Sequence, residues 1–171
     1  NIETAEESIY ERGLELRLAY PNTQEQYIDL EKEFLGNNQY IGCPDIHPKN
    51  LFINENGESI FIDFGRSVYA DQRFMLPNYL AHIVIYTLAG YLNYDIAIEF
   101  LNNAVMGYRQ LSIIDENIFC KYLGMEVLHR SNGKWIQGIN DVDQKSKLLR
   151  FGLEVFDKDV SKIDDLVLLI R

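Results

Sequence analysis

The sequence predicts a mainly helical protein of the α+β class, in which several helices surround one small β-hairpin. Two observations support this fold class. Apolar residues recur at helical spacing through most of the chain, and only the stretch from Tyr40 to Gly65 contains short runs of β-branched and aromatic residues. With 171 residues, of which 47% are apolar, the chain is long enough for one domain with a buried core.

Two helices are expected before the hairpin. The first covers the initial twenty residues, and Thr4 and Glu7 have the spacing of a capping box near its start. Pro21-Asn22-Thr23 interrupts that helix, and the apolar pattern then predicts a second helix from about Gln24 to Phe34.

The hairpin is predicted from two apolar runs and the turn between them. Leu51-Phe52-Ile53 and Ser59-Ile60-Phe61-Ile62 are rich in β-forming residues, and Asn54-Glu55-Asn56-Gly57 separates them. An Asn-Gly pair between two such runs is the strongest short signal for a hairpin. We therefore expect a strand, a tight turn and a second strand, with a loop on either side.

Helical patterns return after about Asp71 and bring the expected total to five or six helices. The first of them, from Met75 to Tyr91, is apolar on nearly all sides and should be buried, and Pro77 fits its first turn. His82 on this helix is expected to be a core histidine with satisfied hydrogen bonds. Three amphipathic helices should follow, with breaks at Asn132-Gly133 and Gly138: Asp95 to Tyr108, Asp115 to His129, and Val142 to Phe156.

Charge and cysteine content exclude several classes of function. Sixteen Lys and Arg residues against 26 Asp and Glu residues give a net charge of −10, which argues against nucleic acid or an anionic membrane as a partner. No apolar run approaches the length of a membrane span, and no secretory signal pattern is present. The two cysteines, Cys43 and Cys120, lack metal-type spacing, so we expect a cytoplasmic location and no cysteine nucleophile.

The loops on either side of the hairpin contain the residues with the clearest chemistry. Asp45 and Asn50 precede the first strand within Cys43-Pro44-Asp45-Ile46-His47-Pro48-Lys49-Asn50, and Asp63 follows the second within Ile62-Asp63-Phe64-Gly65. Because a hairpin brings its two ends together, Asn50 and Asp63 should lie close to each other. Two carboxylates and an amide are oxygen ligands suited to Mg²⁺, and phosphoryl transfer needs a carboxylate for the attacking hydroxyl and metal ligands beside the phosphates.

These segments resemble the catalytic and metal-binding segments of the aminoglycoside phosphotransferase and choline kinase group of the protein-kinase-like superfamily. Asp45-x-His47-Pro48-x-Asn50, the hairpin and Asp63-Phe64-Gly65 have the order and spacing found in that group, and the run on to Tyr79 is also similar to methylthioribose kinases. The resemblance implies Asp45 as catalytic base, Asn50 and Asp63 as Mg²⁺ ligands, and ATP as phosphoryl donor. It also implies that residues 1–171 form the helical C-terminal lobe of such a kinase.

The sequence departs from the group in three places. Cys43-Pro44 stands where the group usually has His-Gly. The run from Asp71 to Leu76 resembles an Asp-Pro-x-x-Asp-Leu segment that braces the catalytic loop, but Gln72 replaces the proline and Met75 replaces the second aspartate, which puts the rigidity of the loop in question. Nothing before Thr23 resembles the sheet, glycine loop and strand lysine of an N-terminal nucleotide-binding lobe, so we expect that lobe to lie outside this chain.

Two neighbouring residues and two functions stay open at this point. His47 and Lys49 are expected to support the loop or to contact phosphate, with an ordinary surface position as the other interpretation of Lys49. The first function is transfer of the γ-phosphoryl group of ATP to a hydroxyl group of a small molecule, which could be an aminoglycoside, a choline-like amine, a sugar-like compound or homoserine. The alternative is a catalytically inactive kinase-like lobe that acts as a binding or docking module, and Met75 in the bracing position favours it.

Overall fold

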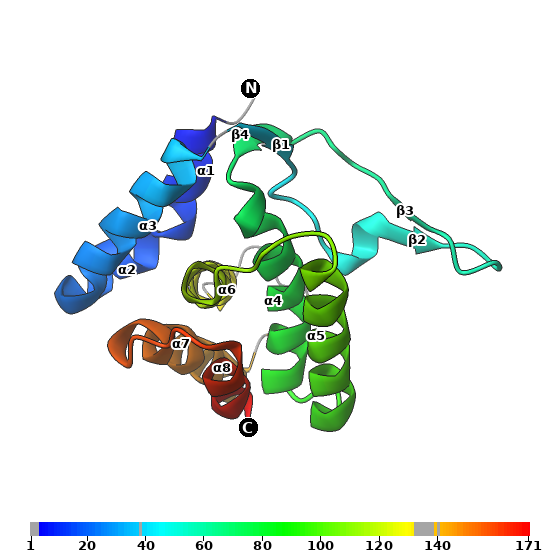
Figure 1. Ribbon diagram of the computed structural model, residues 1–171. Coiled ribbons are helices and arrows are strands. Elements are labelled where there is room, and N and C mark those ends of the chain that lie inside the picture. The colour runs from blue at the N-terminus through cyan, green and yellow to red at the C-terminus, as the bar shows by residue number, and fades with distance from the viewer. Residues whose placement is uncertain (1–3, 38, 132–138, 140) are drawn as a thin grey trace.

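The computed structural model describes residues 4–37, 39–131, 139 and 141–171. Within these ranges the protein has eight α-helices and two small antiparallel sheets of two strands each (Figure 1). The mainly helical α+β class predicted from the sequence is confirmed. The predicted five or six helices and single hairpin are fewer than the helices and ribbons found in the described residues. In the described part of the chain, no helix has the length and apolar character needed to cross a membrane.

Three helices precede the first strand: α1 (Ala5–Arg12), α2 (Leu14–Ala19) and α3 (Gln24–Gly36), with a short 3₁₀ turn, η1 (Pro21–Thr23), before α3. The predicted capping box is present, since the Thr4 hydroxyl accepts from the Glu7 N–H and the Glu7 carboxylate accepts from the Thr4 N–H. The single helix expected here is divided at Gly13. A side chain at this position would overlap the ring of Tyr27 from α3, so the glycine lets α3 pack directly against the junction of α1 and α2.

Two antiparallel ribbons follow, and their elements are β1 (Tyr40–Gly42), η2 (Pro48–Asn50), β2 (Leu51–Ile53), β3 (Ser59–Phe61), β4 (Val68–Ala70) and η3 (Gln72–Phe74). The predicted hairpin is the pair β2–β3, in which Leu51 lies opposite Phe61. Its turn depends on Asn54, whose side chain accepts from two backbone N–H groups, and on Gly57, which has a φ of 79°.

The pair β1–β4 was not expected from the sequence. Tyr40 lies opposite Ala70, so this ribbon joins the two ends of the whole segment that contains the hairpin. The loops before and after the hairpin therefore run between two ribbons, with β1–β4 at one end and β2–β3 projecting at the other (Figure 1). Both ends of each loop are thus fixed by strand pairing.

The remaining helices are α4 (Met75–Leu88), α5 (Tyr94–Arg109), α6 (Glu116–Ser131), α7 (Val142–Asp157) and α8 (Ile163–Ile170). The first four lie within a few residues of the predicted bounds; α4 ends before Tyr91, near Gly90, whose φ is 81°. The eighth helix was missed, although its buried residues Ile163, Leu166 and Ile170 recur at helical spacing. The breaks expected at Asn132-Gly133 and Gly138 lie outside the described residues.

Helix α6 occupies the centre of the fold, where Figure 1 shows it end-on among α1–α3, α4 and α7. It is buried over most of its length. Its approach to α7 is very close, because a Cβ atom on Gly152 would lie 2.4 Å from Cγ of Leu128 and 2.9 Å from the carbonyl oxygen of Gly124. Any polar side chain that α6 directs inward must find its partners within the protein.

Candidate active site

The structure brings Asp45, Asn50 and Asp63 into one region at the base of the hairpin. The Asn50 side-chain amide donates to the backbone carbonyl of Asp45 at 3.2 Å. The Ile62 N–H donates to the carbonyl of Asn50 at 2.9 Å, which places Asp63 one residue beyond that pair. The Cys43 thiol donates to the carbonyl oxygen of Asp63 at 3.6 Å, so the second loop also contacts the segment before Asp45.

Asp45 lies between two consecutive turns of the first loop. The Ile46 N–H donates to the carbonyl of Cys43 at 3.2 Å, and the Asn50 N–H donates to the carbonyl of His47 at 2.9 Å. The Asp45 side chain is 31% exposed, and its Oδ1 lies 3.9 Å from Nε2 of His47. The carboxylate can therefore reach a bound molecule while the backbone around it stays hydrogen-bonded.

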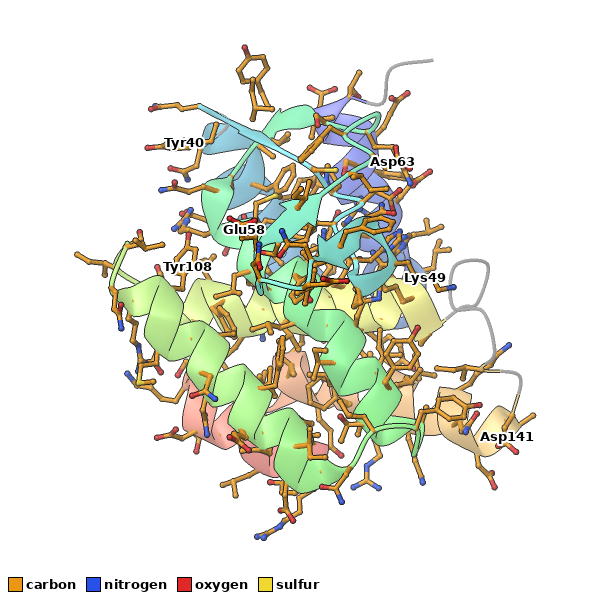
Figure 2. All side chains as sticks on the ribbon, turned by 90° about the vertical axis from the view of Figure 1, so that its right-hand side faces the viewer. Tyr40, Lys49, Glu58, Asp63, Tyr108 and Asp141 are labelled. Carbon is orange, nitrogen blue, oxygen red and sulfur yellow. The ribbon has the colours of Figure 1, made fainter. Side chains whose placement is uncertain are left out.

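Asp63 has the unusual backbone conformation at the site. Its φ is 62°, in the left-handed region that residues with a side chain seldom adopt. Such conformations cost roughly 1–3 kcal/mol and concentrate at functional sites. The side chain is exposed, with Oδ1 close to Gly65, where a Cβ atom would lie 3.4 Å away. In Figure 2, Asp63 and the exposed Lys49 lie on the same side of the view, and Tyr40 and Tyr108 lie on the other.

The site contains oxygen atoms of the kind that Mg²⁺ binds. The Asn50 amide nitrogen donates to the Asp45 carbonyl, which leaves its Oδ1 as an acceptor, and the Asp63 carboxylate is exposed in the next loop. Mg²⁺ typically takes one or two protein oxygens and completes its coordination with water and substrate phosphates. Within the described ranges, no group of three or more His, Cys, Asp or Glu side chains is arranged to hold a metal.

Position 75 contacts the loop, although methionine stands there in place of the aspartate expected from the sequence resemblance. The sulfur of Met75 accepts from the Cys43 N–H at 3.2 Å. A Cβ atom on Gly42 would lie 2.8 Å from the Met75 methyl carbon, so the glycine allows this close approach. At this position a sulfur acceptor therefore contacts the loop, where the resemblance led us to expect a carboxylate.

The same face of α4 makes two further contacts with the loop. Asn78, one turn after Met75, donates to the carbonyl of Pro44 at 2.7 Å. His82, one turn further on, places its ring centroid 5.7 Å from that of His47. Positions 75, 78 and 82 lie on one side of a helix, so α4 contacts the loop at three successive points.

His82 is buried, as expected for a core histidine, but its hydrogen bonding differs from the prediction. Its Nε2 is buried without a hydrogen-bond partner among the described residues. Burial, together with the positive charge of Arg130, lowers the pKa of His82 to about 3. The ring is therefore neutral at physiological pH. Burial also raises the pKa of the Cys43 thiol, which stays protonated and donates to Asp63.

Sequence reasoning missed a buried charged cluster behind the loop. Arg12 of α1 donates to Glu126 of α6 at 3.0 Å and to the carbonyl of Pro44 at 3.1 Å. Arg130 donates to the other oxygen of Glu126 at 2.6 Å and to Oδ1 of Asn78 at 3.4 Å. Burial would raise the pKa of Glu126, but Arg130 and Arg12 outweigh it and lower that pKa, so the carboxylate is charged. The one available signal was the spacing of Glu126 and Arg130, which stand four residues apart in the sequence of α6.

Comparison of the chain with models of known protein families and with curated protein sequences finds no match. The observations that bear on function are therefore those of the site itself. The relevant features are the convergence of Asp45, Asn50 and Asp63, the exposure of both carboxylates, and the contacts that hold the first loop from behind.

Proposed function

We propose that the protein transfers the γ-phosphoryl group of ATP to a hydroxyl group of a small molecule, as the helical C-terminal lobe of a protein-kinase-like phosphotransferase. One observation carries this proposal. Asp45, Asn50 and Asp63 come from both sides of a hairpin and lie in one region at its base, where the Asn50 side-chain amide donates to the backbone carbonyl of Asp45 and keeps its oxygen as an acceptor. A proton acceptor beside two Mg²⁺ ligands is the set that phosphoryl transfer needs.

Each residue then has a definite role. Asp45 orients the attacking hydroxyl and takes its proton as the oxygen bonds to the γ-phosphorus, and the bond from that phosphorus to the bridging oxygen of ADP breaks. Asn50 and Asp63 would hold Mg²⁺, which supplies positive charge to the phosphates when bound. His47, 3.9 Å from Asp45 and packed near a buried ring of α4, supports the loop. Lys49, exposed on the side where Asp63 lies, is suited to contact phosphate (Figure 2).

The surfaces of the two ribbons support the presence of a second unit beside the site. Ile41 and Tyr69 form an exposed apolar pair across β1–β4, and Phe52 and Ile60 form another across β2–β3. All four side chains are more than half exposed. Paired apolar residues of this kind are typical of an interaction surface, and a nucleotide-binding lobe would cover them.

The same ribbons also favour the second candidate, a catalytically inactive lobe that serves as a docking module. The two candidates differ in what they require of the loops. A docking surface needs the apolar pairs, whereas catalysis needs the carboxylates of Asp45 and Asp63 and the amide of Asn50. Support of the loop through Met75 weakens the argument for inactivity that rested on the missing aspartate.

The test uses the complete protein with ATP, Mg²⁺ and a panel of aminoglycosides, choline-like amines and sugars, and it measures ADP release and ATP affinity. Asp63→Asn should abolish transfer, whereas Glu55→Gln, the same change of charge at the exposed turn of the hairpin, should leave it intact. Asp45→Asn should lower turnover by about 10²–10⁴-fold at unchanged ATP affinity.

Three outcomes would count against this proposal. Unchanged turnover in Asp63→Asn would refute the metal-ligand role. An equal loss of turnover and ATP affinity in Asp45→Asn would indicate a folding defect instead of a lost base. ATP binding that is absent, or independent of Mg²⁺, in the complete wild-type protein would favour the docking module.

A further inference from the structure

The backbone carbonyl of Pro44, immediately before Asp45, accepts two buried hydrogen bonds. Asn78 of α4 donates at 2.7 Å, and Arg12 of α1 donates at 3.1 Å. A carbonyl oxygen has two lone pairs, so these two donors use its full capacity. The pyrrolidine ring also fixes the φ of Pro44. The peptide group between Pro44 and Asp45 is therefore restrained by the pyrrolidine ring of Pro44 and by the two hydrogen-bond donors to its carbonyl.

The two donors are themselves joined in a closed ring of hydrogen bonds. Its members are Arg12, Glu126, Arg130, Asn78 and the Pro44 carbonyl, and we call it the Pro44 ring. Ser8 adds two more contacts to Arg12, through its hydroxyl at 2.6 Å and its carbonyl at 2.9 Å. The ring connects three helices, α1, α4 and α6, to one point of the loop.

The net charge of the Pro44 ring strengthens its hydrogen bonds to the Pro44 carbonyl oxygen. The ring contains two guanidinium groups and one carboxylate, so it has one positive charge in excess. The partial negative charge of the Pro44 oxygen faces a guanidinium of Arg12, which is a stronger hydrogen-bond partner than a neutral donor. Glu126 is fully buried and binds both cations, which fixes the directions of their remaining N–H groups.

We propose that Asn78 and Arg12 are positioning residues, which hold the Pro44–Asp45 peptide so that the Asp45 carboxylate stays aimed at the substrate hydroxyl. The proposal rests on the proposed function of Asp45 as the catalytic base. It assigns the Pro44 ring a role beyond packing, because a displacement of about 1 Å of a catalytic group can lower turnover about 10²-fold.

The sharpest variant is Asn78→Asp. Aspartate has nearly the size and shape of asparagine, and its charge offsets the excess positive charge of the ring beside Arg130. It replaces the donor to Pro44 with a charged acceptor, so two oxygen atoms face each other where the hydrogen bond was. The loop should therefore loosen, and urea unfolding of the variant shows how much global stability changes with it.

Gln144→Glu is the matched control. Gln144 of α7 donates to the carbonyl of Ala89, just past the other end of α4, at 2.6 Å. The change again turns an amide donor into a carboxylate against a backbone carbonyl, but far from the Pro44 ring. It should leave the loop and the turnover as in the wild type.

Two readouts on the complete protein decide the question. Amide hydrogen exchange of Ile46 and Asn50, whose N–H groups bond within the loop, should quicken about tenfold in Asn78→Asp. The kcat for transfer should fall about 10²-fold while the KM for ATP stays within twofold. If Asn78→Asp proves unstable, Arg12→Lys serves instead, because lysine keeps the charge beside Glu126 but lacks the planar fork that bonds both Glu126 and Pro44.

Faster loop exchange together with the kcat loss supports the proposal. Unchanged loop exchange, an unchanged kcat, or an equal kcat loss in Gln144→Glu would overturn it. A wild-type protein with no Mg²⁺- and ATP-dependent transfer would refute the proposed function and, with it, the catalytic purpose of the ring. In that case, amide hydrogen exchange of Ile46 and Asn50 would still show whether the Pro44 ring holds the loop.

Discussion

The buried carboxylate of Glu126 should be the most costly single charge to remove from this protein. The perturbation is Glu126→Gln, which keeps the shape of the side chain and removes its charge. Glu126 is fully buried, and its two oxygens accept from Arg12 at 3.0 Å and from Arg130 at 2.6 Å. Glutamine would leave two buried guanidinium groups without an anion and would direct an N–H donor at one of them.

The expected loss of unfolding free energy in Glu126→Gln follows from the burial of the charged cluster. Breaking a buried ion pair by removing one partner costs about 3–5 kcal/mol, because the remaining charge is left uncompensated away from water. The total free energy of unfolding of a domain is about 5–15 kcal/mol, so the loss should be a large fraction of it. With a urea slope of about 2 kcal/mol per molar, the unfolding midpoint should fall by about 2 M.

Glu154 provides a matched control. It also accepts from two cations, Arg150 and Lys158, at 2.7 Å each, but on the surface of α7. Glu154→Gln should lower the free energy of unfolding by no more than about 1 kcal/mol. Urea unfolding of the two variants at pH 7 measures the difference. A loss below about 1 kcal/mol for Glu126→Gln, or equal losses in the two variants, would refute the view that burial makes this cluster costly to break.

Two further predictions concern packing and pH. Gly152→Ala should lower the free energy of unfolding by about 1–3 kcal/mol, because its Cβ would lie 2.9 Å from the Gly124 carbonyl oxygen. The control Gly107→Ala, in open space on α5, should raise the free energy of unfolding by about 0.5–1 kcal/mol. Similar effects of the two changes in thermal unfolding would contradict the close contact of α6 and α7. The pKa of His82 is about 3 in the folded protein, whereas its ordinary value is 6.5. Between pH 6.5 and pH 3 the histidine is therefore protonated in the unfolded chain but not in the folded protein, and the free energy of unfolding should fall as the pH falls. From pH 7 to pH 5 the wild type should lose about 2 kcal/mol more than His82→Phe, and equal losses in urea unfolding would show that His82 titrates normally when folded.

Local patterns in the sequence predicted most of the helices because helices depend on contacts between near neighbours. Helices α5 and α7 begin within one residue of the predicted starts, at caps formed by Asn93 and Asp141. The division of the first helix was not predictable in this way. It depends on the contact of Gly13 with Tyr27, which only the packing of α3 creates.

The second ribbon shows the same limit for strands. Tyr40–Gly42 and Val68–Ala70 are three residues each and lie far apart in the chain. Such short runs have no alternation to indicate a buried face, and their pairing is a non-local contact. The hairpin β2–β3 was predictable because its two strands are joined by a short turn with Asn54 and Gly57 at its ends.

The candidate site likewise has a part that local sequence predicts and a part that depends on contacts between distant elements. The proximity of Asp45, Asn50 and Asp63 could be predicted from the sequence because these residues flank one hairpin, whereas their role as a functional site stays a prediction. The residues that support the first loop come from three helices, and no local pattern connects Arg12 or Asn78 with Pro44. Candidate site residues that flank one hairpin can thus be grouped from the sequence, whereas the residues that contact the loop from other helices are identified only in the folded protein.

Stability alone does not explain why charged residues lie behind the loop. Buried ion clusters can often be replaced by apolar side chains of similar volume at no loss of stability. Apolar residues at positions 12, 78, 126 and 130 would nevertheless leave the Pro44 carbonyl buried without a donor, at a cost of about 1–3 kcal/mol. The loop would relieve that cost by turning its carbonyl toward water, and the peptide before Asp45 would turn with it. The charged cluster is therefore best understood as the means by which three helices hold this one peptide.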